Sequence, residues 1–365
     1  MAMDLNLLPD VIESGEWTAT GHVQGIAVCP EKNFICYSFT TVLVKTDLAG
    51  NLIGTCGGLV GHLGCIDYNK EDGRVWGSLE YKNDAIGKGI MKTLGRESEA
   101  LCENAFYAVA FDVDKIDRVG LDAERDGIMT AVYLPDVVAD FEGKGEDGAD
   151  HRYACSGIDG TAIGPVFGAP KDSPTMLMIA YGVYGDVTRR DNDHQVILQY
   201  DWRRFKEYEQ PLLQGAPHHS GPTADARYFL YTGNTTYGVQ NLCYDPATNY
   251  YFAAVYHGKK EHFPNYDMFV IDASVAPQEA TLAGLDEQGM TLSLAPVGAH
   301  HAPSGTCGFH FPWGATGMHA LGNGCFYISQ ERSTKTPPRV YASTVRLWRY
   351  TGDAEMPFVE VPCAK

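Results

Sequence analysis

Short runs of apolar residues, each about five to eight residues long, alternate with polar turns along most of the chain. Few segments show the 3.6-residue period of an amphipathic helix. Forty glycines and 21 tyrosines fit the same pattern, because glycine suits tight turns and tyrosine suits half-buried strands. The pattern predicts an all-β protein.

One short unit opens an apolar strand five times. The five copies are His22-Val23-Gln24-Gly25, His62-Leu63-Gly64-Cys65, Gly157-Ile158-Asp159-Gly160, Gly238-Val239-Gln240-Asn241 and Ala315-Thr316-Gly317-Met318. Successive side chains of a strand face opposite sides. We therefore expect the second residue of each tetrad to pack between sheets, and the first and third residues to point together the other way.

Further strands follow each tetrad in a fixed order. Second strands are predicted at 34–38, 75–79, 176–180, 251–255 and 325–329. Third strands, most of which end in Asp before a turn, are predicted at 42–47, 107–112, 196–201, 268–272 and 345–350. A more variable fourth strand follows, as at 51–55 and 357–361. Short helices are expected within 89–105 and 135–141.

Five copies of a four-stranded antiparallel meander resemble a five-bladed β-propeller over nearly the whole chain. We predict a single propeller domain, 1–365, with insertions in its second to fourth blades. The approximate blades are 18–58, 59–150, 151–232, 233–312 and 313–365. A six-bladed alternative would need a further blade between Asp114 and Tyr153, where no tetrad occurs.

Charge narrows the choice of partner. The chain has 28 basic and 46 acidic residues, for a formal net charge of −18. This balance disfavours nucleic acids and anionic membrane surfaces, which both require basic patches. A small-molecule substrate is therefore the expected partner, and the oligomeric state stays open.

Two further features favour the cytoplasm. Residues 1–17 lack the basic start and apolar core of a signal peptide, and no apolar run is long enough to span a membrane. The ten cysteines form no Cys-x-x-Cys pair and mostly fall in apolar runs, which is typical of reduced core thiols.

Alternating strand direction brings three kinds of segment to one face of a propeller: the tetrads, the loops after the second strands and the connections between blades. The inward tetrad positions there are His22, Gln24, His62, Asp159 and Gln240. They could hold a column of water along the axis. Alternatively they could bind one divalent cation, either calcium through Asp159 and amide oxygens, or manganese or zinc through the histidines.

The loops and connections supply further candidates. We expect Glu80 and Glu331 to act as acid and base, with Tyr81 or His257 moving a proton. The residues predicted to bind substrate are Tyr184, Arg189, Lys259, His219 and His301. No nucleotide cofactor is expected, because Gly87-Lys88-Gly89 lacks the spacing of a phosphate loop.

The mixture of His and Gln around the axis resembles propeller lyases that act on uronic acids, in ligand type only, since those enzymes have a different blade count. Five-bladed glycosidases are more similar in architecture, but their catalytic carboxylate is replaced here by His22 and Gln24. Their mechanism is therefore not carried over. We predict a hydrolase or lyase acting on a sugar or sugar acid, with or without a metal. The alternative is a non-catalytic scaffold that binds partners through Trp313, Tyr184 and Phe263.

Overall fold

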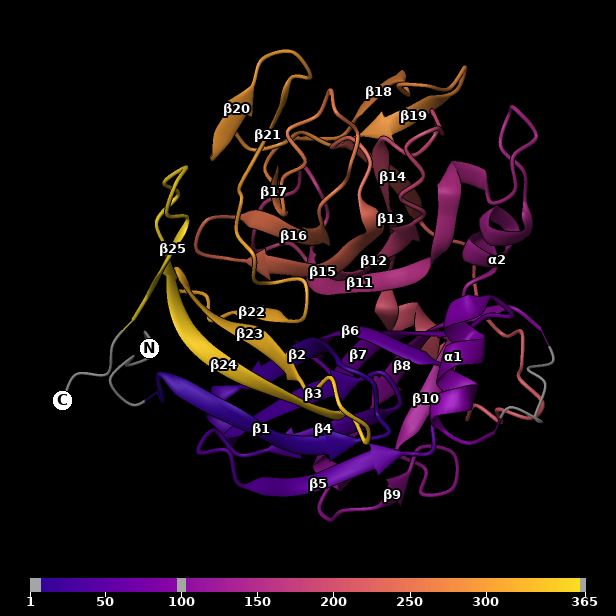
Figure 1. Ribbon diagram of the computed structural model, residues 1–365, viewed down its shortest axis with the longest axis vertical. Coiled ribbons are helices and arrows are strands. Elements are labelled where there is room, and N and C mark those ends of the chain that lie inside the picture. The colour runs from indigo at the N-terminus through magenta and orange to yellow at the C-terminus, as the bar shows by residue number, and fades with distance from the viewer. Residues whose placement is uncertain (1–7, 97–102, 362–365) are drawn as a thin grey trace.

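The computed structural model describes residues 8–96 and 103–361. Its strands form five small, mainly antiparallel sheets arranged in a ring (Figure 1). This arrangement confirms the five-bladed β-propeller. Within the described ranges, no helix is long and apolar enough to cross a membrane.

The first strands of the five blades surround the axis. They are β2 (Val23–Cys29), β6 (His62–Asn69), β11 (Cys155–Pro165), β15 (Thr236–Asp245) and β22 (Met318–Ala320). Each of these strands contacts the first strand of the next blade, and β22 in turn contacts β2. The contacts therefore close a ring around the axis, and each of the five tetrads begins within three residues of the start of its strand.

The outer strands follow the predicted order. Blade one adds β3 (Phe34–Phe39), β4 (Val42–Thr46) and β5 (Leu52–Gly57); blade two adds β7 (Arg74–Tyr81), β8 (Ala105–Phe111) and β10 (Met129–Tyr133); blade three adds β12 (Thr175–Val183), β13 (His194–Tyr200) and β14 (Ala226–Tyr231); blade four adds β16 (Tyr250–Tyr256) and β17 (Met268–Asp272); blade five adds β23 (Cys325–Ser333) and β24 (Val340–Tyr350). All five predicted second strands lie inside observed strands.

The fifth blade is completed by the other end of the chain. Strand β1 (Val11–Thr18) pairs antiparallel with β24, from Val11 opposite Arg346 to Thr18 opposite Val340. Strand β25 (Phe358–Glu360), which the sequence predicted, pairs with the far end of β24. The sequence analysis assigned no strand to residues 11–18. Their pairing joins the first and last blades and stabilises ring closure.

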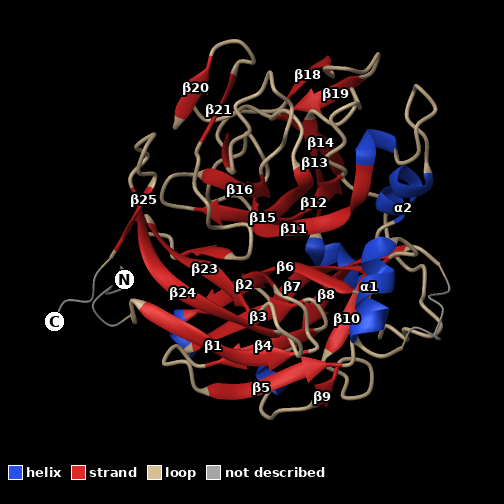
Figure 2. Cartoon of the chain, viewed as in Figure 1, coloured by secondary structure: helices blue, strands red, loops and turns tan. Residues whose placement is uncertain are grey.

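Two helices and several short strands are inserted between the strands of the blades. Helix α1 (Ala85–Thr93) follows β7, and helix α2 (Pro135–Glu142) follows β10 (Figure 2). Three short strands extend blade edges: β9 (Leu121–Asp122) pairs with β5, β19 (Gln288–Thr291) pairs with β14, and β18 (Gln278–Thr281) pairs with β19. Strands β20 (Ala299–His301) and β21 (Thr306–Gly308) form a separate two-stranded sheet. Helix α1 begins before the predicted range, because Asp84 caps it by accepting a hydrogen bond from the Gly87 amide at 2.9 Å.

The core lies between neighbouring blades. The second tetrad residues Val23, Leu63, Ile158 and Val239 are all fully buried, as the strand alternation predicted. Thr316, the fifth copy, is only partly buried, and β22 begins two residues later. The fifth tetrad therefore differs from the other four and contributes least to the polar end of the axis.

Candidate functional site

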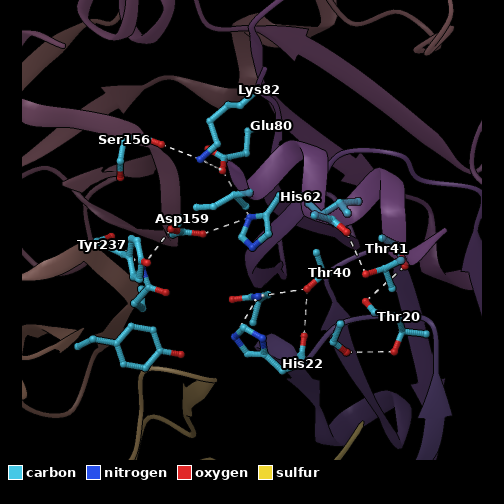
Figure 3. A pocket seen from close by; sticks show the side chains of 18 residues that line it. Thr20, His22, Thr40, Thr41, His62, Glu80, Lys82, Ser156, Asp159 and Tyr237 are labelled. Atoms are coloured by element: carbon cyan, nitrogen blue, oxygen red, sulfur yellow. Dashed lines mark hydrogen bonds and ion pairs between the residues drawn. The ribbon is translucent and has the colours of Figure 1, made fainter. Parts of the chain in front are cut away.

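A cavity of about 400 Å³ opens on the face where the first strands begin (Figure 3). Its lining includes six of the predicted site residues: His22, Gln24, His62, Glu80, Asp159 and Gln240. It also includes Lys82, Ser156, Tyr237 and Tyr256, the threonines Thr20, Thr40, Thr41 and Thr93, and part of α1. The structure thus brings all five predicted metal ligands and one predicted catalytic carboxylate together.

A buried ion pair forms one end of this cavity. Lys82 Nζ lies 2.5 Å from Glu80 Oε1 and donates to the Ser156 carbonyl oxygen at 2.7 Å. The Ile158 amide donates to Glu80 Oε2 at 2.9 Å. Burial alone would lower the pKa of Lys82, but the charges of Glu80 and Asp84 outweigh it, so the pKa is raised. Lys82 therefore stays protonated, and its charge is neutralised by Glu80.

Asp159 and His62 face each other beside this pair. Asp159 Oδ2 accepts a hydrogen bond from Gln240 Nε2 at 3.0 Å. Asp159 Oδ1 lies 3.5 Å from His62 Nδ1, and His62 Nδ1 lies 3.6 Å from Glu80 Oε1. Within the described part of the chain, neither Asp159 Oδ1 nor His62 Nδ1 has a hydrogen-bond partner, although both atoms are buried.

Burial sets the protonation of these two groups. It raises the pKa of Asp159 well above its usual value, and the charge of Glu80 raises it further. It also lowers the pKa of His62 to about 3, with help from the charges of Lys82 and His22. Both shifts favour the neutral forms, a carboxylic acid next to an uncharged imidazole.

The two amides at the axis use their N–H groups within the protein. Gln24 Nε2 donates to His22 Nε2 at 3.1 Å and to Thr40 Oγ1 at 3.3 Å. His22 Nε2 is therefore an acceptor. Gln240 Nε2 donates to the Tyr237 carbonyl oxygen at 2.8 Å as well as to Asp159. No described residue donates to either amide oxygen. Both oxygens can therefore accept hydrogen bonds from a ligand.

The arrangement of these side chains does not test whether the predicted divalent cation binds at the axis. The described residues contain no group of three or more His, Cys, Asp or Glu side chains placed to hold a metal ion. A site built with the amide oxygens of Gln24 and Gln240 stays a prediction, as does the axial water column.

The other predicted catalytic residues lie outside the cavity lining. The Tyr81 hydroxyl donates to Gln214 Oε1 at 3.1 Å, and its buried ring packs in the core. His257 is exposed, with its Nδ1 2.9 Å from Asp267 Oδ1. Glu331 acts on the site only through its charge. Burial lowers the pKa of His22, and the Glu331 charge opposes this shift.

None of the five predicted substrate-binding residues lines the cavity. Arg189 is fully engaged by Asp191 and by backbone carbonyl oxygens, and Tyr184 packs on the His151 ring with centroids 5.0 Å apart. Lys259 is exposed. His219 Nε2 lies 2.7 Å from Glu103 Oε1, and His301 Nδ1 lies 2.8 Å from Ser304 Oγ.

Sequence reasoning missed Lys82, Tyr237, Tyr256 and the apolar residues of α1. The signal for Lys82 was available, because residues 80 and 82 of an extended segment face the same side. Tyr237 directly precedes a tetrad. The α1 residues could not be placed, because the path of an inserted helix depends on tertiary packing rather than on the repeat.

Comparisons with known proteins assign the chain to no family. No protein-family model matches it, and no curated protein matches it. Among solved structures it is similar to Kuenenia stuttgartiensis hydrazine synthase (10% identity, TM-score 0.37), covering 84% of this chain and 61% of that one. It is also similar to the pyranose dehydrogenase PQQ domain from Coprinopsis cinerea in its holo form (9%, 0.33, covering 88% and 81%) and to the Dos1 propeller (8%, 0.29, covering 88% and 78%).

Proposed function

We propose that this propeller is a hydrolase or lyase that transforms a small, polar, sugar-like molecule in the axial cavity by general acid–base catalysis. One observation carries the proposal: Asp159 Oδ1 and His62 Nδ1 are buried, lie 3.5 Å apart and have no hydrogen-bond partner within the described residues. Other buried atoms, such as His194 Nδ1, also lack a partner, but Asp159 and His62 line the cavity, where a ligand can reach them. The hydroxyl groups of a substrate could supply the missing partners.

Two roles follow from the protonation states. Asp159, whose pKa burial raises, would act as the general acid and protonate a leaving oxygen. His62 turns Nδ1 toward the carboxylate of Glu80. When Nδ1 carries the proton, Nε2 is free to remove one from water or from a substrate carbon. Glu80 would orient the imidazole rather than react, because its carboxylate oxygens are already bonded to Lys82 and to the Ile158 amide; burial raises its pKa and the charge of Lys82 opposes this shift.

A neutral sugar fits the site better than a sugar acid. Lys82 is the one Lys or Arg in the described cavity lining, and its charge is taken by Glu80. A substrate carboxylate would therefore be buried near Glu80 without a free cation to compensate its charge.

The scaffold alternative has weaker support. Of the three anchors that the sequence suggested, Phe263 is buried, Tyr184 is half-buried and only Trp313 is exposed. The polar groups of the site converge in a cavity instead of forming a flat patch. We also propose the cytoplasm as the compartment, since the eight described cysteines are free and buried.

The test is a substrate screen with neutral glycosides and uronate-containing sugars, run on the wild type and two variants. We expect turnover that Asp159→Asn and His62→Gln each reduce at least about 100-fold. His194→Gln is the matched control, because His194 is a buried histidine that does not line the cavity. Loss of turnover in the control alone, or equal turnover in all four proteins, would contradict the proposal.

The metal-assisted form of the mechanism needs its own measurement. A calcium, manganese or zinc ion held by His22, Gln24, His62, Asp159 and Gln240 would polarise a substrate oxygen. Elemental analysis of the wild type beside the Gln24→Ala/Asp159→Ala double variant separates the two forms. Near-stoichiometric metal that the variant loses would support the ion. Its absence from both proteins would leave acid–base catalysis by Asp159 and His62 alone.

A further inference from the structure

The cavity has two chemically different walls. The tetrads supply one wall, with Asp159, His62, Gln24 and Gln240. Helix α1 supplies the other wall through Ile86, Gly89, Ile90 and Thr93. Ile86 is half-buried, and Ile90 is 8% exposed in the absence of a ligand. A ligand that fills the cavity must therefore contact hydrogen-bonding groups on one side and hydrocarbon on the other.

Most N–H donors of the polar wall are already used within the protein. The N–H groups of Gln24, Gln240 and Lys82 are directed to protein atoms. Asp159 Oδ1 and His62 Nδ1 have no partner among the described residues. No described residue donates to the amide oxygens of Gln24 and Gln240, which line the same wall. A head group that carries several O–H donors matches this set, whereas a carboxylate carries none.

Helix α1 contains two glycines with opposite surroundings. A Cβ at Gly87 would collide with the carbonyl oxygen of Lys82, the residue that follows β7, so the close approach of the first helical turn to this residue requires glycine there. A Cβ at Gly89 would meet no atom within 4 Å. Glycine in a helix interior is unfavourable. Packing does not account for Gly89, and its missing side chain leaves space beside Ile86 and Ile90.

We infer that the substrate is an uncharged amphiphile. Its hydroxyl-bearing head binds at Asp159 and His62, and its apolar substituent lies on Ile86 and Ile90 in the space that Gly89 leaves. This inference rests on the proposed function only in taking the cavity as the substrate site. Gly89 is then a specificity-determining residue, because its size limits the substituent that the enzyme accepts.

The probes are 1-butanol, 1-pentanol and 1-hexanol, each a single hydroxyl head with an alkyl tail, and their binding to the full-length protein is measured by ligand-observed NMR. We expect affinity to rise about three- to four-fold for each added methylene. Gly89→Leu fills the space and is expected to weaken 1-hexanol at least about ten-fold. Lys92→Leu is the control, because it adds leucine to an exposed position of the same helix that does not line the cavity.

The head group is tested by comparing 1-hexanol with hexanoate, which we expect to bind at least about ten-fold more weakly. An affinity that is independent of tail length, or equal losses in Gly89→Leu and Lys92→Leu, would overturn the apolar site. Hexanoate binding as tightly as hexanol would overturn the uncharged head. These binding results are independent of turnover. Alkanol binding without any turnover would leave the inference standing and refute the proposed enzyme. Conversely, if Gly89→Leu left turnover unchanged for substrates of every size, the proposed enzyme would stand and the inference about the apolar site would be refuted.

Discussion

His62 Nδ1 lies 3.5 Å from Asp159 Oδ1, in a buried position where neither atom has a hydrogen-bond partner among the described residues. The two side chains come from the first strands of adjacent blades, so the ring itself holds them together. Leaving both atoms unsatisfied reduces stability. A site that retains this cost is a candidate for function.

This relationship predicts that Asp159→Asn separates stability from activity. An asparagine has nearly the shape of the neutral carboxylic acid, can keep its oxygen as acceptor for Gln240, and removes a group that is costly to bury in its charged form. We expect the free energy of unfolding at pH 7 to stay equal or rise by up to about 1 kcal/mol. Turnover is expected to fall at least about 100-fold. Urea unfolding measures the predicted change in stability, and the substrate assay measures the predicted loss of turnover. A large loss of stability would mean that the carboxylic acid is structural.

A second prediction concerns acid sensitivity. Burial lowers the pKa of His194 to about 4, whereas an unfolded histidine titrates near 6.5. The unfolded chain therefore binds more protons between these values, so the contribution of His194 is fully present above pH 6.5 and is lost as the pH falls toward 4. We expect His194 to lower the free energy of unfolding by about 2 kcal/mol between pH 6.5 and 5.

Urea unfolding of wild type and His194→Gln at both pH values tests this. The variant should show a correspondingly shallower pH dependence. His62 is less suitable, because the raised pKa of its neighbour Asp159 acts with the opposite sign at mildly acidic pH. Parallel pH profiles for the wild type and the His194 variant would show that His194 titrates normally in the folded protein.

The repeat made much of the site predictable. Alternation along each first strand placed His22, Gln24, His62, Asp159 and Gln240 at one end of the axis, and all five line the cavity. The repeat says nothing about side chains in irregular loops. Arg189 and His257 were expected to face a ligand, but each pairs with an aspartate near it in sequence, Asp191 or Asp267.

Ring closure was not predictable in the same way. The burial of β1 alternates only in its first half, and its pairing with β24 joins residues more than 300 positions apart. Such pairing depends on the closed shape of the propeller rather than on any local pattern. The same holds for α1, whose apolar residues contact the cavity because the helix is inserted between β7 and β8.

A third prediction tests the buried ion pair. Lys82→Met leaves Glu80 buried beside Asp159 without its cation, and we expect the free energy of unfolding to fall by about 3–5 kcal/mol. The double variant Lys82→Met/Glu80→Gln removes both charges and should recover most of this loss. Denaturant unfolding of the two variants and of Glu80→Gln alone completes the cycle. A double variant as unstable as Lys82→Met would show that the packing of Lys82, rather than its charge, is what stabilises the fold.

The two glycines of α1 give a final prediction, in which the same substitution has opposite effects two residues apart. Gly89→Ala adds a methyl group where no atom lies within 4 Å and replaces a poor helix former, so the free energy of unfolding should rise by up to about 1 kcal/mol. Gly87→Ala drives a methyl group into the Lys82 carbonyl oxygen, so we expect a loss of more than about 1 kcal/mol. Because both variants gain the same helix propensity, the difference between their unfolding midpoints isolates the contact with Lys82. Equal midpoints would mean that α1 does not pack on Lys82, and the apolar wall of the cavity would then lie elsewhere.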